Sequence, residues 1–134
     1  MIYLLDTNVC IKYLNGRSSE IRQKVALHGP QTIALCSVVK AELFYGAMKS
    51  HNPQKTLAQQ HQFVSHFQSL PFDDSAAETY SEIRADLEKR GTPIGPNDLL
   101  IASIAIANNL TLVTHNRREF SRVQGLKIED WETS

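Results

Sequence analysis

Four polar positions of the sequence each lie in or beside an otherwise apolar stretch. Asp6 follows the apolar run IYLL, Glu42 shares a helical face with apolar neighbours in AELFYGA, and Asp98 begins the apolar segment GPNDLLIASIAIANN. The fourth position follows TLVT, where Asn116 and Glu119 are the candidates. An ionised carboxylate among apolar residues needs a partner, because its burial alone is costly. These acids are therefore candidates for a catalytic or metal-binding site.

Each position also has a purely structural explanation. Asp6 and Asp98 suit the first turn of a helix, where a carboxylate accepts hydrogen bonds from free backbone amides. Glu42 can lie at the surface or in an ion pair, and Asn116 and Glu119 can belong to a plain turn. Taken singly, the positions leave both explanations open.

Taken together, the four positions favour a shared site. If the strands before Asp6 and Thr114 are neighbours in one sheet, and two helices pack over the same edge, three or four carboxylate-type oxygens meet there. Their mutual repulsion then requires a cation. Oxygen ligands without a set of Cys or His select Mg²⁺ or Mn²⁺ over zinc. Because magnesium binds phosphates, this ligand set predicts phosphodiester chemistry.

The hydrophobic pattern predicts short buried strands that alternate with helices. We expect strands at residues 2–5, 32–37, 70–73, 111–114 and 126–131. We expect helices at residues 7–15, 18–28, 37–50, 54–70, 74–91 and 95–109, with a loop or one helical turn at 115–120. Such alternation predicts an α/β sandwich with a parallel sheet, whose site forms outside the carboxyl ends of the strands.

Length and composition indicate one compact domain. Hydrophobic residues make up 42% of the 134 residues, and a chain of this length can bury roughly two thirds of its unfolded surface. The sequence has neither a secretion signal nor an apolar stretch of the roughly 18 residues that a membrane helix needs, so we expect a cytoplasmic protein. Cys10 and Cys36 lie in apolar surroundings without zinc-ligand spacing, which favours reduced core thiols.

Positive charge is concentrated in the first half of the chain. Residues 1–70 contain seven Lys or Arg and three Asp or Glu, whereas residues 71–134 contain seven and eleven. This asymmetry permits nucleic-acid contact without establishing it. The candidates for phosphate contacts are Lys12, Lys40, Lys49, Arg117 and Arg118. A solvated surface role is the simpler explanation for each, and His115 is better explained as a turn residue than as a general base.

Four sequence blocks in fixed order resemble the PIN-domain ribonuclease toxins of VapBC toxin–antitoxin modules. The blocks are LLDTN, AELFYGA, RGTPIGPNDLLIASIA and LVTHNRREF..V.GL.IEDW. The resemblance covers essentially the whole chain, residues 1–134. It implies a single PIN domain, with a three-layer α/β/α sandwich around a central parallel sheet of about five strands.

The resemblance also implies roles for individual residues. It places the metal-binding, catalytic acids at Asp6, Glu42 and Asp98. Many PIN domains have Asp where this chain has Asn116, which leaves Glu119 as the substitute for the fourth catalytic acid. The supporting polar residues fall at Thr7, Asn8 and Thr114. Asn116 also suits a supporting role, orienting a water or an Asp6 oxygen, because an amide offsets none of a metal's charge.

The activity implied is endoribonuclease cleavage with Mg²⁺, which Mn²⁺ can replace, leaving 5′-phosphate and 3′-hydroxyl ends and inhibiting translation. The substrate is often transfer RNA, and members with a similar GTPIGP block cut initiator transfer RNA. The implied partners are a cognate VapB-type antitoxin and a second copy of the chain in a homodimer, with operator DNA contacted only through the antitoxin.

Two alternatives remain. A catalytically inactive PIN-like domain would only bind RNA or its partner, although the intact acids at positions 6, 42 and 98 argue against it. A phospho-receiver domain also has acids at strand ends and binds Mg²⁺, but it needs a Lys after its fifth strand, and none follows LKIEDW.

Overall fold

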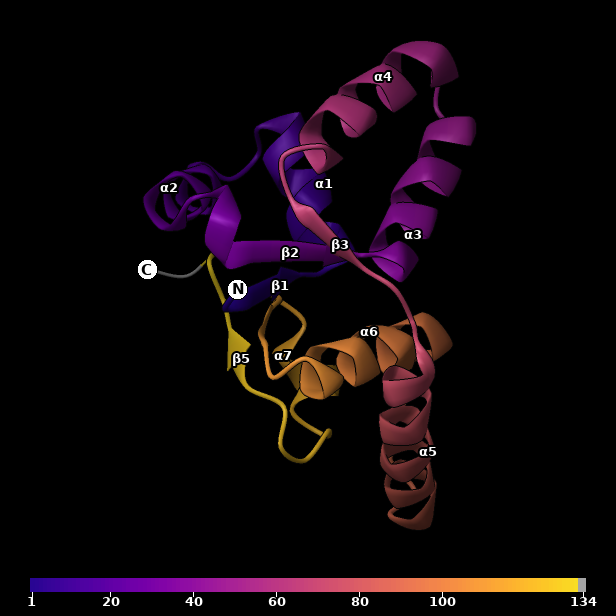
Figure 1. The fold of residues 1–134 in the computed structure, drawn as a ribbon. Helices are drawn as coiled ribbons and strands as arrows, with labels where there is room; N and C mark the ends of the chain where they lie inside the picture. Colours follow the sequence, from indigo (N-terminus) through magenta and orange to yellow (C-terminus); the bar gives the residue numbers. More distant parts are fainter. Residues whose placement is uncertain (133–134) are drawn as a thin grey trace.

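The computed structural model describes residues 1–132 and has a central sheet of short parallel strands (Figure 1). The strands are β1 Tyr3–Leu5, β2 Ile33–Cys36, β3 Gln68–Leu70, β4 Thr111–Val113 and β5 Ile128–Glu129. Their order in the sheet is β3-β2-β1-β4-β5, and all neighbours pair in parallel. The central strand β1 therefore pairs with β4, which lies far away in the sequence. The predicted parallel sheet is confirmed.

Helices connect the strands and cover both faces of the sheet. They are α1 Thr7–Asn15, α2 Ser19–His28, α3 Ser37–Met48, α4 Pro53–Val64, α5 Asp74–Lys89, α6 Pro96–Ala107 and α7 Arg117–Phe120, with a 3-10 helix η1 Pro30–Thr32 before β2. In Figure 1, α1, α2 and α4 lie on one side of the sheet and α5 and α6 on the other. This is the expected three-layer arrangement. Within residues 1–132, no helix is both long and apolar enough to cross a membrane.

The middle strands are buried on both faces, which explains their continuous apolar sequences. Leu4, Leu5 and the whole of β2 have no exposed surface. Cys10 and Cys36 are free and buried, as expected. Burial raises the pKa of both thiols, so they stay protonated and serve as packing residues.

One predicted helix is shorter than its sequence pattern suggests. The helix expected at residues 54–70 ends at Val64, and the strand expected at 70–73 lies instead at β3, Gln68–Leu70. The Phe67 backbone N–H donates to the Val64 carbonyl at 3.2 Å, so the chain turns and then pairs in parallel with β2. Pairing with the edge of β2 thus overrides the local helical pattern, which carries only a weak preference.

Candidate active site

Asp6 lies between β1 and α1, where the N-cap explanation and the site explanation both apply. Its Oδ1 accepts a hydrogen bond from the Val9 backbone N–H at 2.9 Å, and its Oδ2 accepts one from the Thr114 hydroxyl just after β4. Asp6 is only 5% exposed. Burial raises the pKa of Asp6, and the two hydrogen bonds oppose that rise because they favour the ionised carboxylate.

Glu42 lies on α3 and is held by side chains from two other helices. The Thr7 hydroxyl, on α1, donates to Glu42 Oε1 at 2.5 Å. The Asn97 amide, on α6, donates to Glu42 Oε2 at 3.3 Å. Thr7, one of the predicted supporting residues, thus contacts a candidate acid directly. Asn97 was not among the predicted residues, although its place beside Asp98 at the start of α6 was a usable signal.

Asp98 is the third residue of α6, and its carboxyl group meets that of Glu119 on α7. The pKa of Asp98 is raised to about 7 by partial burial, then by a hydrogen bond with Glu119 and the negative charges of Glu119, Glu42 and Asp6. The Asn116 amide donates to Glu119 Oε2 at 2.9 Å and holds the pKa of Glu119 below its usual range. The charges of all four acids therefore act on one another at the carboxyl edge of the sheet.

We call Asp6, Glu42, Asp98 and Glu119 the acidic site. Among residues 1–132, no Lys, Arg or His nitrogen lies within 4.0 Å of any of these carboxylates. Four carboxylates without a cationic side chain repel one another, and this repulsion adds to the effect of burial in raising the pKa of Asp98. Their oxygen atoms are the donors that a hard divalent cation prefers. The acidic site is therefore chemically suited to hold such a cation.

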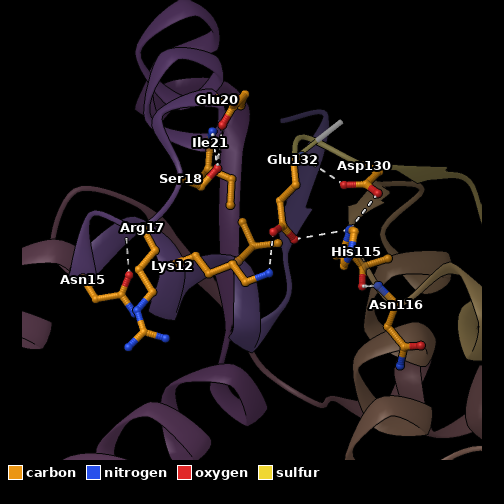
Figure 2. Close-up of polar contacts among 12 residues, drawn as sticks. Lys12, Asn15, Arg17, Ser18, Glu20, Ile21, His115, Asn116, Asp130 and Glu132 are labelled. Atoms are coloured by element: carbon orange, nitrogen blue, oxygen red, sulfur yellow. Dashed lines mark hydrogen bonds and ion pairs between the residues drawn. The ribbon is translucent and has the colours of Figure 1, made fainter. Parts of the chain in front are cut away.

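A second charged group, the ion-pair cluster, comprises Lys12, His115, Arg117, Asp130 and Glu132. Figure 2 shows Lys12, His115, Asp130 and Glu132 of this cluster. His115 Nδ1 lies 2.9 Å from Asp130 Oδ2 and 3.5 Å from Glu132 Oε2. The Lys12 ammonium contacts Glu132, and Arg117 Nε lies 3.9 Å from Asp130 Oδ2. Among the described residues, His115, Asp130 and Glu132 are the only three His, Cys, Asp or Glu side chains whose possible ligand atoms all lie within 4.8 Å of one another. Here, however, the chain supplies its own cations.

The remaining predicted residues fall in different places. Asn8 is exposed on α1 and, within the described part of the chain, makes no side-chain hydrogen bond. Asn116 caps α7 and also holds Glu119, so it supports another acid. His115 is exposed, as expected of a turn residue, but its pairing with Asp130 was not foreseen. The three acids named first and Glu119 thus lie close enough for the charges of the other three to raise the pKa of Asp98, and Thr7, Thr114 and Asn116 each contact one of these acids.

Proteins of similar sequence and fold cover almost the whole chain. The PIN domain family model matches residues 3–126. The chain is 40% identical over 129 residues to the tRNA(fMet)-specific endonuclease VapC of Salmonella typhimurium, covering 96% of this chain and 97% of that protein. It is 41% identical over 133 residues to Ribonuclease VapC2 of Rickettsia felis, covering 98% and 99%. The crystal structure of DNA-bound VapBC from Salmonella typhimurium superposes with a TM-score of 0.93 at 40% identity, covering 98% of both chains.

Proposed function

The chain belongs to the VapC family of PIN-domain proteins, and from this membership we propose that it is an endoribonuclease, the toxin of a toxin–antitoxin pair, which inhibits translation by cutting RNA. The observation that carries the proposal is the acidic site, with its carboxylates and no cation of its own. A phosphodiester is itself anionic, so it approaches such a site only when a cation lies between the two.

We assign this cation as Mg²⁺, which Mn²⁺ can replace, and its ligands as Asp6, Glu42 and Asp98. When bound, it activates water as a nucleophile and stabilises the charge that develops on the phosphate. The donor set fits the ion, because it contains only carboxylate oxygens and neither Cys nor His. The raised pKa of Asp98 supports the assignment, since a bound cation would offset the negative charges of Glu119, Glu42 and Asp6 that contribute to the rise.

The polar neighbours hold the carboxylates in position. The Thr114 hydroxyl orients Asp6, and the Thr7 hydroxyl orients Glu42. A carboxylate oxygen that accepts one such bond still has a lone pair for an ion. Hydrogen bonds of this kind fix the ligand and keep it ionised, which strengthens its interaction with a metal.

Glu119 is the fourth acid of the proposed site. Asn116 holds its Oε2, and its carboxyl group shares a hydrogen bond with Asp98. We propose that Glu119 serves a second, weaker metal ion and that Asn116 positions it. Asn8 lines a cavity together with Glu42, and we propose it as a supporting polar residue on that side of the site.

The relatives support specific partners and a substrate. The similar Salmonella typhimurium structure is of DNA-bound VapBC, so we propose a VapB-type antitoxin as the partner, contact with operator DNA only through it, and a homodimer of this chain. A relative named for tRNA(fMet) supports transfer RNA as the substrate, and initiator transfer RNA in particular. The site of action is then the bacterial cytoplasm, where this RNA is used.

The test is to induce the chain alone and with its antitoxin, and to sequence RNA 5′ ends in both cultures. Induction alone should arrest growth and create new 5′-phosphate ends in transfer RNA. Because Asp6 also caps α1, Asp98→Asn accompanies Asp6→Ala as an inactive control with less risk to folding. Growth arrest that persists in both variants would contradict the proposal. Normal growth with the folded wild-type chain would instead favour the alternative of an inactive, PIN-like binding domain.

A further inference from the structure

A cavity of about 470 Å³ opens beside the acidic site, between α1, α3 and α6. Its lining includes Thr7, Asn8 and Ile11 from α1, Glu42 and Tyr45 from α3, and Asn97 from α6. In Figure 1 these three helices converge beside the sheet, and α3 packs against both α1 and α6. Since Glu42 belongs to both the cavity and the acidic site, the two are adjacent, and the cavity can hold a neighbouring part of a molecule that reacts at the site.

Two large apolar side chains of the lining are exposed. Tyr45 is 64% exposed and Ile11 is 42% exposed. The Lys49 ammonium lies 5.0 Å from the centre of the Tyr45 ring, within the range of a cation–π contact. An exposed aromatic ring next to a positive charge is a common combination in sites for single-stranded nucleic acid, where bases stack on rings and cations contact the backbone.

The polar groups of the lining are suited to a neutral, planar ligand. Glu42 is the only charged residue of the lining and would repel a phosphate group. Asn8 and Asn97 each carry an amide, which offers both donors and an acceptor. The hydrogen bond from Asn97 to Glu42 uses one amide donor and leaves the carbonyl oxygen of Asn97 available. Such amides can bond to the polar edge of a nucleobase.

We propose that the cavity holds one unpaired nucleobase of the RNA substrate, next to the scissile phosphate. The base stacks on Tyr45, and Asn8 and Asn97 contact its polar edge. The volume lies within the usual range for small-molecule pockets. This inference rests on the proposed function, and it adds that the RNA must present an unpaired nucleotide at the cleavage position.

The experiment combines protein variants with RNA lacking single bases. Wild type, Tyr45→Ala and Tyr45→Phe are compared on the RNA whose cut site has been mapped, and on copies with an abasic ribose at each flanking position. Tyr45→Ala should raise KM at least about fivefold, the lower end for loss of one stacked base, whereas Tyr45→Phe should retain near-normal KM. Met48→Ala is the matched control, because Met48 is exposed on the same helix but does not line the cavity.

The decisive result is non-additivity between the two changes. One abasic position should weaken the wild type about as much as Tyr45→Ala does, and Tyr45→Ala should lose nothing further on that RNA. Additive losses in KM from the two changes would overturn the inference. A normal KM for Tyr45→Ala, with only antitoxin binding weakened, would overturn it as well. In both cases the proposed function stands. A wild-type chain that cuts no RNA would overturn both.

Discussion

The acidic site and the ion-pair cluster are two groups of carboxylates at the same edge of one sheet, yet their electrostatics differ. In the ion-pair cluster, Asp130 and Glu132 have Lys12, His115 and Arg117 within 4.0 Å. In the acidic site, no cationic side chain among residues 1–132 comes that close, and the pKa of Asp98 rises to about 7. The tighter group is therefore the one whose carboxylates already have countercharges, from Lys12 and Arg117. Missing countercharge, more than close spacing, distinguishes the candidate cation site.

The largest expected effect is the difference in cleavage rate between two Asp→Asn variants, one in each group. Asp98→Asn should slow RNA cleavage at least about 100-fold, which corresponds to about 2.7 kcal/mol, because an amide is isosteric with the carboxylate but offsets no cation charge. Asp130→Asn should stay within about threefold of wild type. Single-turnover cleavage by purified, folded variants measures both. Comparable losses in the two variants would show that the ion-pair cluster is as necessary as the acidic site.

A smaller effect is expected for the fourth acid. Glu119→Gln should slow cleavage at least about tenfold, an effect of about 1.4 kcal/mol, with partial rescue by excess Mn²⁺. Asn116→Ala should have a milder effect, because it removes the hydrogen bond that positions Glu119 but leaves the charge. Rate measurements across a Mn²⁺ series compare the two. A dead Asn116→Ala variant beside a normal Glu119→Gln variant would reverse these roles.

Metal binding should stabilise the fold only through the acidic site. At ten times its dissociation constant, Mg²⁺ contributes about 1.4 kcal/mol, which raises the melting temperature by about 4–7 °C in a domain of this size. Asp130→Asn should keep this shift, and Asp98→Asn should lose most of it. Thermal unfolding in EDTA and in millimolar Mg²⁺ provides the measurement. If Asp130→Asn loses the Mg²⁺-induced rise in melting temperature and Asp98→Asn keeps it, the cation site lies in the ion-pair cluster instead.

The smallest effect concerns pH in the absence of metal. The folded pKa of Asp98 is about 7, above the unfolded value of about 3.9. The folded chain thus holds this proton more tightly, and the stability that it contributes is complete below the unfolded pKa and is lost as pH rises through 7. In EDTA, wild type should therefore lose stability relative to Asp98→Asn as pH rises from about 4 to about 7, with no further change above that. Parallel stability curves for the two proteins would contradict the raised pKa.

The sequence was informative where a polar residue adjoins its own apolar element. Asp6 and Asp98 were found in this way, because a strand or helix that is apolar throughout leaves an acid at its end conspicuous. The parallel sheet followed from the same alternation of short apolar runs with amphipathic helices. These features depend on residues a few positions apart, and local patterns record them.

Interactions between distant segments could not be predicted from local sequence patterns. The contact between Glu42 and Asn97 spans 55 residues, and the pairing of His115 with Asp130 spans 15. Both depend on how helices and strands pack, which no local periodicity encodes. The error in the predicted position of strand β3 has the same cause, because only its pairing with β2 distinguishes Gln68–Leu70 from the end of a helix.

The hydrogen bond between Asp6 and Thr114 joins residues 108 positions apart, across the pairing of β1 with β4. During synthesis, β1 therefore leaves the ribosome long before β4, one of its two neighbours in the sheet, exists. Contacts at such separation form late in folding, because they require closure of a long loop. A nascent chain consequently has no assembled acidic site until most of it has been made. The ribosome that produces this enzyme has thus nearly finished its work before the product becomes able to cut RNA.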